Sequence, residues 1–361
     1  MMEAAANIRL PGSAPYEYPI FIQESYAGLA QILRERPGKL FIISQKGLES
    51  VLDLFFRESG VPRDRLYLIE QGEENKHLNQ LGEVYNWLIQ SGIDRSSSII
   101  APGGGVVGDF AGFVASTILR GVPFIQIPTT LLASVDSSVG GKVAVNADFG
   151  KNMVGSFYHP AFVYCNVSVF STLPEDEWSC GFAEIVKHSF LEETSRDLNY
   201  LEQNVQNIRK PEILSLVIRD NVRFKASIVS QDEKEAGLRS ILNLGHTTAH
   251  ALESITHYKK FSHGQAVSRG LVTALLLSEK TGLSATDRER MLSLMQKLAL
   301  PLDTAGFGAA ELLEHMKFDK KNTGGQIRFV LLEKPGKPVF GIPITAEEFE
   351  NAWSAQKRLF G

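Results

Sequence analysis

The sequence predicts an α/β domain over residues 1–172 followed by a mainly α-helical domain over residues 173–361. In the first half, short apolar segments alternate with segments of helical spacing, which is typical of a parallel sheet covered by helices. In the second half helical spacing dominates, and only IRFVLL (327–332) looks extended. The 361 residues are enough for two domains.

Five strands are expected in the first half. They are FIIS (41–44), RLYLIE (65–70), SSIIAP (97–102), PFIQIP (123–128) and AFVYCNV (161–167). Helices are predicted over 47–59 and about 77–91. From residue 173 onward the expected helices follow one another with few extended segments, so the domain boundary is placed near residue 172.

Composition excludes several classes of protein. Apolar residues make up 43% of the chain and charged residues 22%, as in ordinary globular proteins. The net charge of −4 gives no basic excess for nucleic acid or a membrane surface. No apolar run approaches a membrane span, and the N-terminal stretch lacks the apolar segment of a signal peptide. The two cysteines cannot form a disulfide framework, which favours a reducing, cytoplasmic setting.

A glycine loop follows the third expected strand. Gly103, Gly105 and Gly108 fit the pattern G-x-G-x-x-G between a strand and a helix. Such a loop lets backbone N–H groups and a helix N-terminus approach a pyrophosphate. The acidic residue of the dinucleotide fingerprint is missing, and the loop comes third in strand order rather than first. The loop therefore indicates either phosphate binding outside the usual Rossmann order or a tight structural turn.

A polar stretch occupies residues 129–152. It places Asp136, Lys142, Lys151 and Asn152 among small and apolar residues. A buried charge is costly unless it is paired. The stretch is interpreted either as a solvated loop or as part of a phosphate or sugar-phosphate site.

Two histidines lie four residues apart in LNLGHTTAHALE (242–253). On a helix His246 and His250 share one face, so both could reach one metal ion. A third ligand could be Glu184 or His263, but the histidines could also be ordinary surface or core residues. If DEKEAGLRSILN (232–243) is helical, Glu235, Arg239 and Asn243 also share a face.

Taken together, the motifs resemble the 3-dehydroquinate synthases, within the wider sugar-phosphate cyclases. The matching stretches occur in family order over most of the chain: GEENK (72–76), PGGGVVGDFAGFVAS (102–116), RGVPFIQIPTTLLASVDSSVGGKVAVN (120–146), GKNMVGSFYHP (150–160), GFAEIVK (181–187), LRSILNLGHTTAHALE (238–253) and HGQAV (263–267). The resemblance implies an α/β N-terminal dinucleotide-binding domain and a mainly α-helical C-terminal metal-binding domain. It also implies a homodimer, NAD, and zinc or cobalt.

The resemblance assigns roles by position. The implied metal ligands are Glu184, His246 and His263, and the implied catalytic residues are His250, Glu235 and Lys187. The implied substrate contacts are Arg120 (reaching a neighbouring subunit), Asp136, Lys142, Asn152, Lys225, Arg239 and Asn243. The implied NAD contacts are Gly72, Glu73, Lys76, Gly104, Gly105, Val106, Gly108, Asp109, Thr129, Thr130, Lys142, Lys151, Phe170 and Thr172. Lys320 or Lys321 is a further implied pocket residue.

The implied reaction converts 3-deoxy-D-arabino-heptulosonate 7-phosphate to 3-dehydroquinate. It combines transient oxidation by NAD, β-elimination of phosphate, re-reduction and aldol ring closure. Related alternatives are another sugar-phosphate cyclase, an NAD- and metal-dependent polyol-phosphate dehydrogenase that would release NADH, and a non-enzymatic nucleotide sensor. Four residues depart from the family pattern: Gln45, Gln265, Ala249 and Arg269.

Overall fold

The computed structural model describes residues 2–10, 16–235, 237–317 and 326–361, so Lys320 and Lys321 lie outside the described residues. The chain forms two compact units. The first unit comprises Met1–Leu173 together with Leu214–Lys234, and the second comprises Pro174–Ile213 together with Glu235–Gly361. The single boundary expected near residue 172 does not include this return of Leu214–Lys234 to the first unit.

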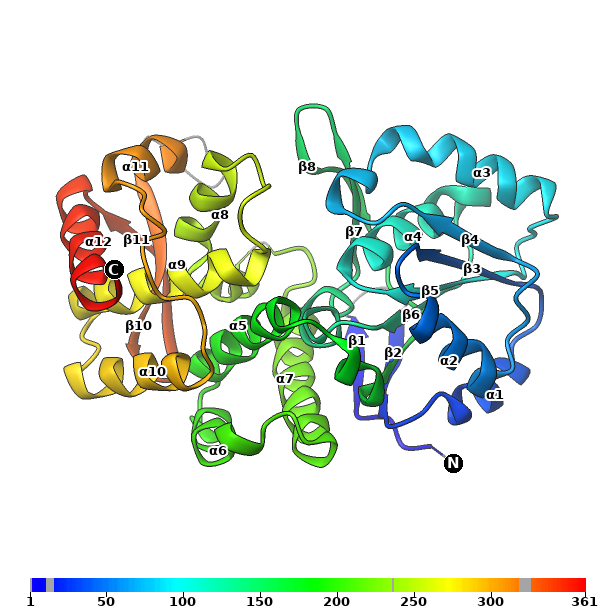
Figure 1. The fold of residues 1–361 in the computed structure, drawn as a ribbon, viewed down its shortest axis with the longest axis horizontal. Coiled ribbons are helices and arrows are strands. Elements are labelled where there is room, and N and C mark those ends of the chain that lie inside the picture. Colours follow the sequence, from blue (N-terminus) through cyan, green and yellow to red (C-terminus); the bar gives the residue numbers. More distant parts are fainter. Residues whose placement is uncertain (1, 11–15, 236, 318–325) are drawn as a thin grey trace. The chain divides into compact units, whose positions relative to one another are not determined.

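The first unit is built on a seven-stranded sheet in the order β1-β2-β9-β6-β5-β3-β4 (Figure 1). Its strands are β1 (Ala6–Leu10), β2 (Tyr16–Gln23), β3 (Leu40–Gln45), β4 (Leu66–Ile69), β5 (Ser98–Gly103), β6 (Phe124–Pro128) and β9 (Phe162–Asn166). All neighbouring pairs are parallel except β1 and β2. The parallel sheet and its five expected strands are confirmed. The strands β1 and β2 were not predicted.

Burial explains why these segments form central strands. Every residue of β5, β6 and β9 is buried, as expected for parallel strands with helices on both faces. The covering helices include α1 (Ala27–Arg34), α2 (Glu49–Ser59), α3 (Leu81–Gln90) and α4 (Gly105–Thr117). In Figure 1, α3 lies above β3 and β4, and α1 and α2 lie below them. Most residues of α4 are buried, so the helix is held against the sheet and begins directly after β5.

An antiparallel hairpin occupies much of the polar stretch that was predicted without strands. It pairs β7 (Lys142–Ala147) with β8 (Gly150–Phe157). Val143 and Val145 of β7 are buried in the core that surrounds α4. The other side chains of the hairpin are mostly partly or fully exposed, so the pattern lacked the continuous apolar run by which a buried strand is recognised.

The second unit is mainly helical, as expected. Its helices are α5 (Glu175–Leu191), α6 (Arg196–Asn204), α8 (His246–Ile255), α9 (His263–Leu277), α10 (Ala285–Lys297), α11 (Ala309–Lys317) and α12 (Ala346–Phe360). Helix α7 (Pro211–Gln231) begins in this unit and continues into the first. The extended segment at 327–332 is confirmed as β10 (Ile327–Lys334), and it pairs with an unpredicted strand, β11 (Lys337–Ile344). None of the described helices is both long and apolar enough to cross a membrane.

Arg269, unusual for this sequence pattern, has a structural explanation. Its guanidinium donates to Asp303 at 2.9 Å and 3.2 Å and to the carbonyl oxygen of Gln265 at 3.0 Å. It also lies 4.9 Å from the centre of the Phe261 ring. The side chain thus joins α9 to the segment that precedes α11, and its buried charge is paired.

Candidate active site

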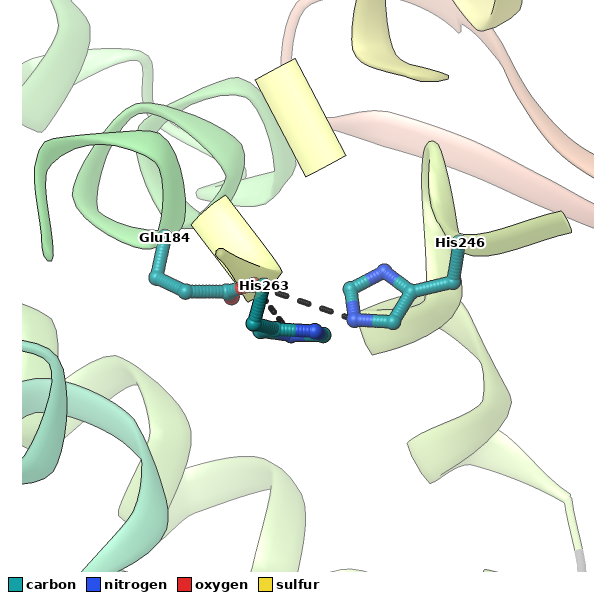
Figure 2. A group of neighbouring side chains, drawn as sticks. All are labelled: Glu184, His246 and His263. Carbon is teal, nitrogen blue, oxygen red and sulfur yellow. Dashed lines mark ion pairs between the residues drawn. The ribbon is translucent and has the colours of Figure 1, made fainter. Parts of the chain in front are cut away.

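Three side chains with metal-binding groups converge in the second unit (Figure 2). Nε2 of His246 lies 3.7 Å from Oε1 of Glu184, and Nε2 of His263 lies 3.5 Å from the same oxygen. One ligand atom from each residue lies within 4.8 Å of the others. One carboxylate and two imidazoles are a donor set of catalytic zinc sites, which use three protein ligands and leave a position open.

Close helix packing brings the three residues together. Helix α9 begins at His263, capped by the Ser262 hydroxyl with Gln265 completing the capping box. A Cβ at Gly264 would overlap the backbone of Cys180, so α9 lies directly against α5, which carries Glu184. A Cβ at Gly270 would overlap the carbonyl oxygen of Gly245, the residue before α8. These contacts place His246 and His263 beside Glu184.

Gly270→Ala is expected to weaken metal binding, because the new methyl group would push the start of α8 away from α9. Overpacking of this kind costs about 1–3 kcal/mol of folding stability. The matched control is Gly308→Ala, because a Cβ there would meet no atom within 4 Å. The two variants are compared by urea unfolding and by zinc titration. Wild-type zinc affinity in Gly270→Ala would contradict this account of how the site is assembled.

The charge states of Glu184 and His246 suit a metal ion, whereas His263 must give up a proton to bind one. Burial lowers the pKa of His263, but the Glu184 and Glu253 carboxylates outweigh it and raise the pKa to about 10. Burial raises the pKa of Glu184, but the positive charge of Lys187 and the nearby His263 imidazole outweigh it and hold the pKa well below its usual value. Burial and the charge of Lys187 hold the pKa of His246 well below its usual value, which keeps this imidazole neutral. Metal ligands must be deprotonated in this way.

Glu184 itself lacks the hydrogen bonds that a buried carboxylate usually has. Its side chain is completely buried. Neither oxygen accepts a hydrogen bond of normal geometry from a described residue, although the Lys187 ammonium contacts Oε2. Buried acceptors without partners are rare and call for an explanation. A metal ion on Glu184, His246 and His263 would satisfy them, so the residues present fit the implied metal.

His250 lies one turn after His246 on α8 and is not part of this cluster. The centres of the two rings are 5.6 Å apart and their planes are nearly perpendicular. Among the described residues, the groups that could hold a metal do not include His250. The four-residue spacing therefore puts both histidines on one side of α8. Only His246 is close enough to Glu184 to share a metal ion with it.

Glu235, Arg239 and Asn243 do not share one helix. Glu235 has a left-handed φ of 58°, and the short 3-10 helix η7 (Leu238–Asn243) begins only after Gly237. The non-helical backbone of Gly237 interrupts the helix that spacing suggested. Glu235 and Asn243 still meet, because Nδ2 of Asn243 donates to Oε1 of Glu235 at 2.8 Å. Arg239 is buried within η7.

The first unit brings together two of the implied substrate contacts, Asp136 and Lys225. Nζ of the buried Lys225 donates to both Oδ1 and the backbone carbonyl of Asp136, each at 2.6 Å. Asp136 lies in a π-helical turn (Ala133–Ser137), a local geometry frequent at functional sites. Lys142 is exposed at the start of β7, and Lys151 is half-buried in β8.

The glycine loop lies at the carboxyl end of the parallel sheet. Gly103 ends β5 beside Pro128 of β6, and the N–H of Thr129 donates to the Gly103 carbonyl at 2.9 Å. Ligands of open α/β sheets bind at this edge. The hydroxyl of Thr129 is buried and has no hydrogen-bond partner among the described residues. The fit to a phosphate-bearing ligand is therefore good.

The remaining residues implied for NAD lie in the first unit, on or beside the same elements. Gly104 precedes α4, whose first residues include Gly105, Val106, Gly108 and Asp109. Thr130 follows Thr129, and its methyl group lies 3.1 Å from a Cβ placed on Gly104. Gly72 directly precedes a short 3-10 helix that begins at Glu73. Phe170, which is buried, and Thr172, which is exposed, lie in another 3-10 helix, Val167–Thr172.

The buried side chain of Lys76 links three polar residues. Nζ of Lys76 donates to Asp109 Oδ2 and to Asn152 Oδ1, each at 2.8 Å, and lies 3.2 Å from Glu73 Oε1. Burial lowers the pKa of Lys76, but Asp109 and Glu73 outweigh it and raise the pKa above its usual value. Asn146, to which no role was assigned from the sequence, donates to Glu73 and accepts from the Asn152 N–H at 2.9 Å.

Lys76→Met is expected to destabilise the protein by roughly 3–5 kcal/mol, because it leaves Asp109 as an unpaired carboxylate in a largely buried site. Lys76→Met combined with Asp109→Asn should recover most of that loss. Lys46→Met, in the exposed Lys46–Glu70 pair, should cost less than about 1 kcal/mol. Urea unfolding at neutral pH measures all three. Equal losses in the single and double variants would refute the ion pair's role.

Solved structures of sugar-phosphate cyclases share this fold. A 2-deoxy-scyllo-inosose synthase, solved with carbaglucose-6-phosphate, NAD+ and Co2+, superposes with a TM-score of 0.84 at 24% identity over 98% of this chain and 99% of that one. The 2-epi-5-epi-valiolone synthase from Streptomyces hygroscopicus subsp. jinggangensis, with NAD+ and Zn2+ bound, gives 0.84 at 21% identity over 97% of this chain and 99% of that one. The fold is that of a sugar-phosphate cyclase.

Sequence comparison narrows this class. Residues 66–180 match the N-terminal domain of 3-dehydroquinate synthase and residues 181–322 match its C-terminal domain. The 3-dehydroquinate synthase of Leptospira interrogans is 52% identical over 94% of this chain and 95% of its own. That of Legionella pneumophila (strain Philadelphia 1) is 47% identical over 93% of each chain. The chain belongs to the 3-dehydroquinate synthase family.

Proposed function

We propose that the chain converts 3-deoxy-D-arabino-heptulosonate 7-phosphate to 3-dehydroquinate and phosphate, with NAD and a zinc or cobalt ion as cofactors. The observation that carries the proposal is the meeting of Glu184, His246 and His263, with His250 beside them, in a chain 52% identical to a curated 3-dehydroquinate synthase. It is thus an NAD- and metal-dependent carbon–oxygen lyase of the shikimate pathway.

The second unit supplies the metal ligands and a proton-transfer group. A metal ion held by Glu184, His246 and His263 would supply Lewis acidity toward a substrate hydroxyl. His250 moves a proton to or from the substrate, because imidazole exchanges protons near neutral pH. Lys187, beside Glu184, adds positive charge to a site that receives an anionic substrate.

Polar side chains bind the substrate's anionic and hydroxyl groups. The phosphate and carboxylate are met by Lys142, Lys225 and Arg239, because a guanidinium or ammonium donates charge-assisted hydrogen bonds to such anions. Asn152 and Asn243 bind hydroxyl groups. Asp136 and Glu235 hold Lys225 and Asn243 in place through the contacts described above.

The first unit supplies the cofactor side. NAD would accept a hydride and return it within one turnover, so the protein needs only to bind and orient it. Backbone N–H groups of Gly104–Val106 and the start of α4 hold the pyrophosphate. The unpartnered hydroxyl of Thr129 donates a hydrogen bond to the cofactor. The side chains of Lys76, Glu73 and Asp109 bind a part of the cofactor beyond the pyrophosphate.

The protein works in the cytoplasm as a homodimer and binds neither nucleic acid nor membranes. Support for a second copy comes from Arg120, which is exposed and held in a left-handed conformation with φ of 68° next to Leu119 with φ of 52°. Non-glycine residues in this region cluster at functional sites. Light scattering of the purified protein measures its mass in solution. A monomer at working concentrations would contradict the dimer.

The direct test supplies metal-loaded protein with the heptulosonate phosphate and NAD+, and follows phosphate release and the product by NMR. Release of phosphate together with 3-dehydroquinate is expected, and a chelator should stop both. The matched control substrate is a hexose 6-phosphate, which lacks the carboxylate and should not react. Absence of phosphate release from the heptulosonate phosphate, or faster release from the control, would refute the proposal.

A further inference from the structure

A carboxylate with no part in the proposed ligand set lies behind one of the ligands. Glu253 is in the last turn of α8, seven residues after His246, and its side chain is 8% exposed. Its Oε1 lies 3.2 Å from Nδ1 of His263. Seven residues are two turns of helix, so one face of α8 carries both His246 and Glu253.

The two ring nitrogens of His263 therefore face two different carboxylates. Nδ1 faces Glu253, and Nε2 lies 3.5 Å from Oε1 of Glu184, where the metal is proposed. The nitrogens point in different directions from the ring, so a proton on Nδ1 that is donated to Glu253 leaves the Nε2 lone pair directed at the metal position.

His246 has the corresponding arrangement with a weaker partner. Its Nδ1 lies 3.2 Å from the backbone carbonyl oxygen of Leu244, and its Nε2 is the nitrogen nearer to Glu184. Both histidines thus present Nε2, but a neutral carbonyl orients one ring and a carboxylate orients the other. A carboxylate partner makes an imidazole more basic as well as fixing its orientation.

We infer that Glu253 is a positioning residue that fixes the Nδ1–H tautomer and the ring orientation of His263 and strengthens that ring as a metal ligand. The inference rests on the proposed metal site at Glu184, His246 and His263. It adds a role for the glutamate that ends the run LNLGHTTAHALE. In this role Glu253 acts on the metal through His263.

The test measures zinc dissociation constants by competition with a chelator. Glu253→Ala should weaken zinc binding by about 10- to 100-fold, the usual effect of losing an outer partner of a ligand. Glu253→Gln should bind with intermediate affinity, because its amide oxygen still accepts from Nδ1–H but carries no charge. Glu289→Gln, the same exchange at an exposed position on α10, should match the wild type.

Two further readouts separate positioning from a structural role. Nitrogen NMR of the zinc-loaded protein should show the Nδ1–H tautomer of His263 in the wild type and lose its hydrogen-bonded shift in Glu253→Ala. A merely structural role would lower the melting temperature of metal-free Glu253→Gln and leave its zinc affinity unchanged. That result, or wild-type affinity in a folded Glu253→Ala, would overturn the inference.

A matched variant separates this inference from the proposed function. One outcome overturns only the role of Glu253: the wild type binds zinc, His246→Ala loses zinc, and Glu253→Ala keeps the wild-type zinc affinity. If the wild type binds neither zinc nor cobalt, or if His246→Ala binds as the wild type does, the metal site and the role of Glu253 both fail.

Discussion

His246→Ala is expected to lose both the bound metal and the activity. The change removes one of the three side chains that meet at Glu184, and two remaining ligands hold zinc poorly. A catalytic metal contributes several kcal/mol to the transition state, so the rate should fall by about 1,000-fold or more. Metal content is measured by elemental analysis after dialysis, and activity by phosphate release.

The control for this substitution is His257→Asn. His257 is exposed after the end of α8 and has a left-handed φ of 50°, which asparagine tolerates. It should keep wild-type metal content and rate. Full metal occupancy in His246→Ala would contradict the proposed ligand set.

His250→Ala is expected to lose activity while keeping the metal. His250 is one turn from His246 but outside the group that meets at Glu184. Loss of a positioned acid–base group usually lowers the rate by about 100- to 10,000-fold. The variant is assayed beside His246→Ala for phosphate release and metal content.

A second measurement checks that the loss lies in proton transfer. His250→Ala should keep its NAD affinity, because the implied NAD contacts lie in the first unit. Exogenous imidazole should restore part of the rate. Loss of zinc equal to that of His246→Ala would refute the division of labour between the two histidines.

The fold was predictable where burial is continuous. The strands β3, β5, β6 and β9 are short apolar runs that are largely buried, and the sequence pattern located all four. It also located β4, an apolar run at the edge of the sheet in which only Ile69 is buried. The hairpin β7–β8 escaped prediction because only one face of β7 is buried and β8 is largely exposed. The return of Leu214–Lys234 to the first unit depends on tertiary contacts that no local pattern contains.

The site was predictable only in part, because tertiary contacts bring its residues together and no local sequence pattern contains those contacts. Spacing places His246 and His250 on one face of a helix, but it does not show which of them faces Glu184. Glu184 lies 62 residues before His246 in the sequence. Close packing at Gly264 and Gly270 decides which histidine faces it. Glu253 and Asn146 were inside recognised motifs, and their roles became visible only from their partners, His263 and Glu73.

In the proposed reaction, the hydride taken from the substrate returns to it within the same turnover. The most direct measurement supplies NAD-free protein with excess heptulosonate phosphate and NAD+ in an amount below that of the substrate. If the hydride returns in each turnover, phosphate released per NAD+ should far exceed one while no NADH accumulates. Phosphate release that stops at one per NAD+, with NADH formed in equal amount, would contradict this return of the hydride.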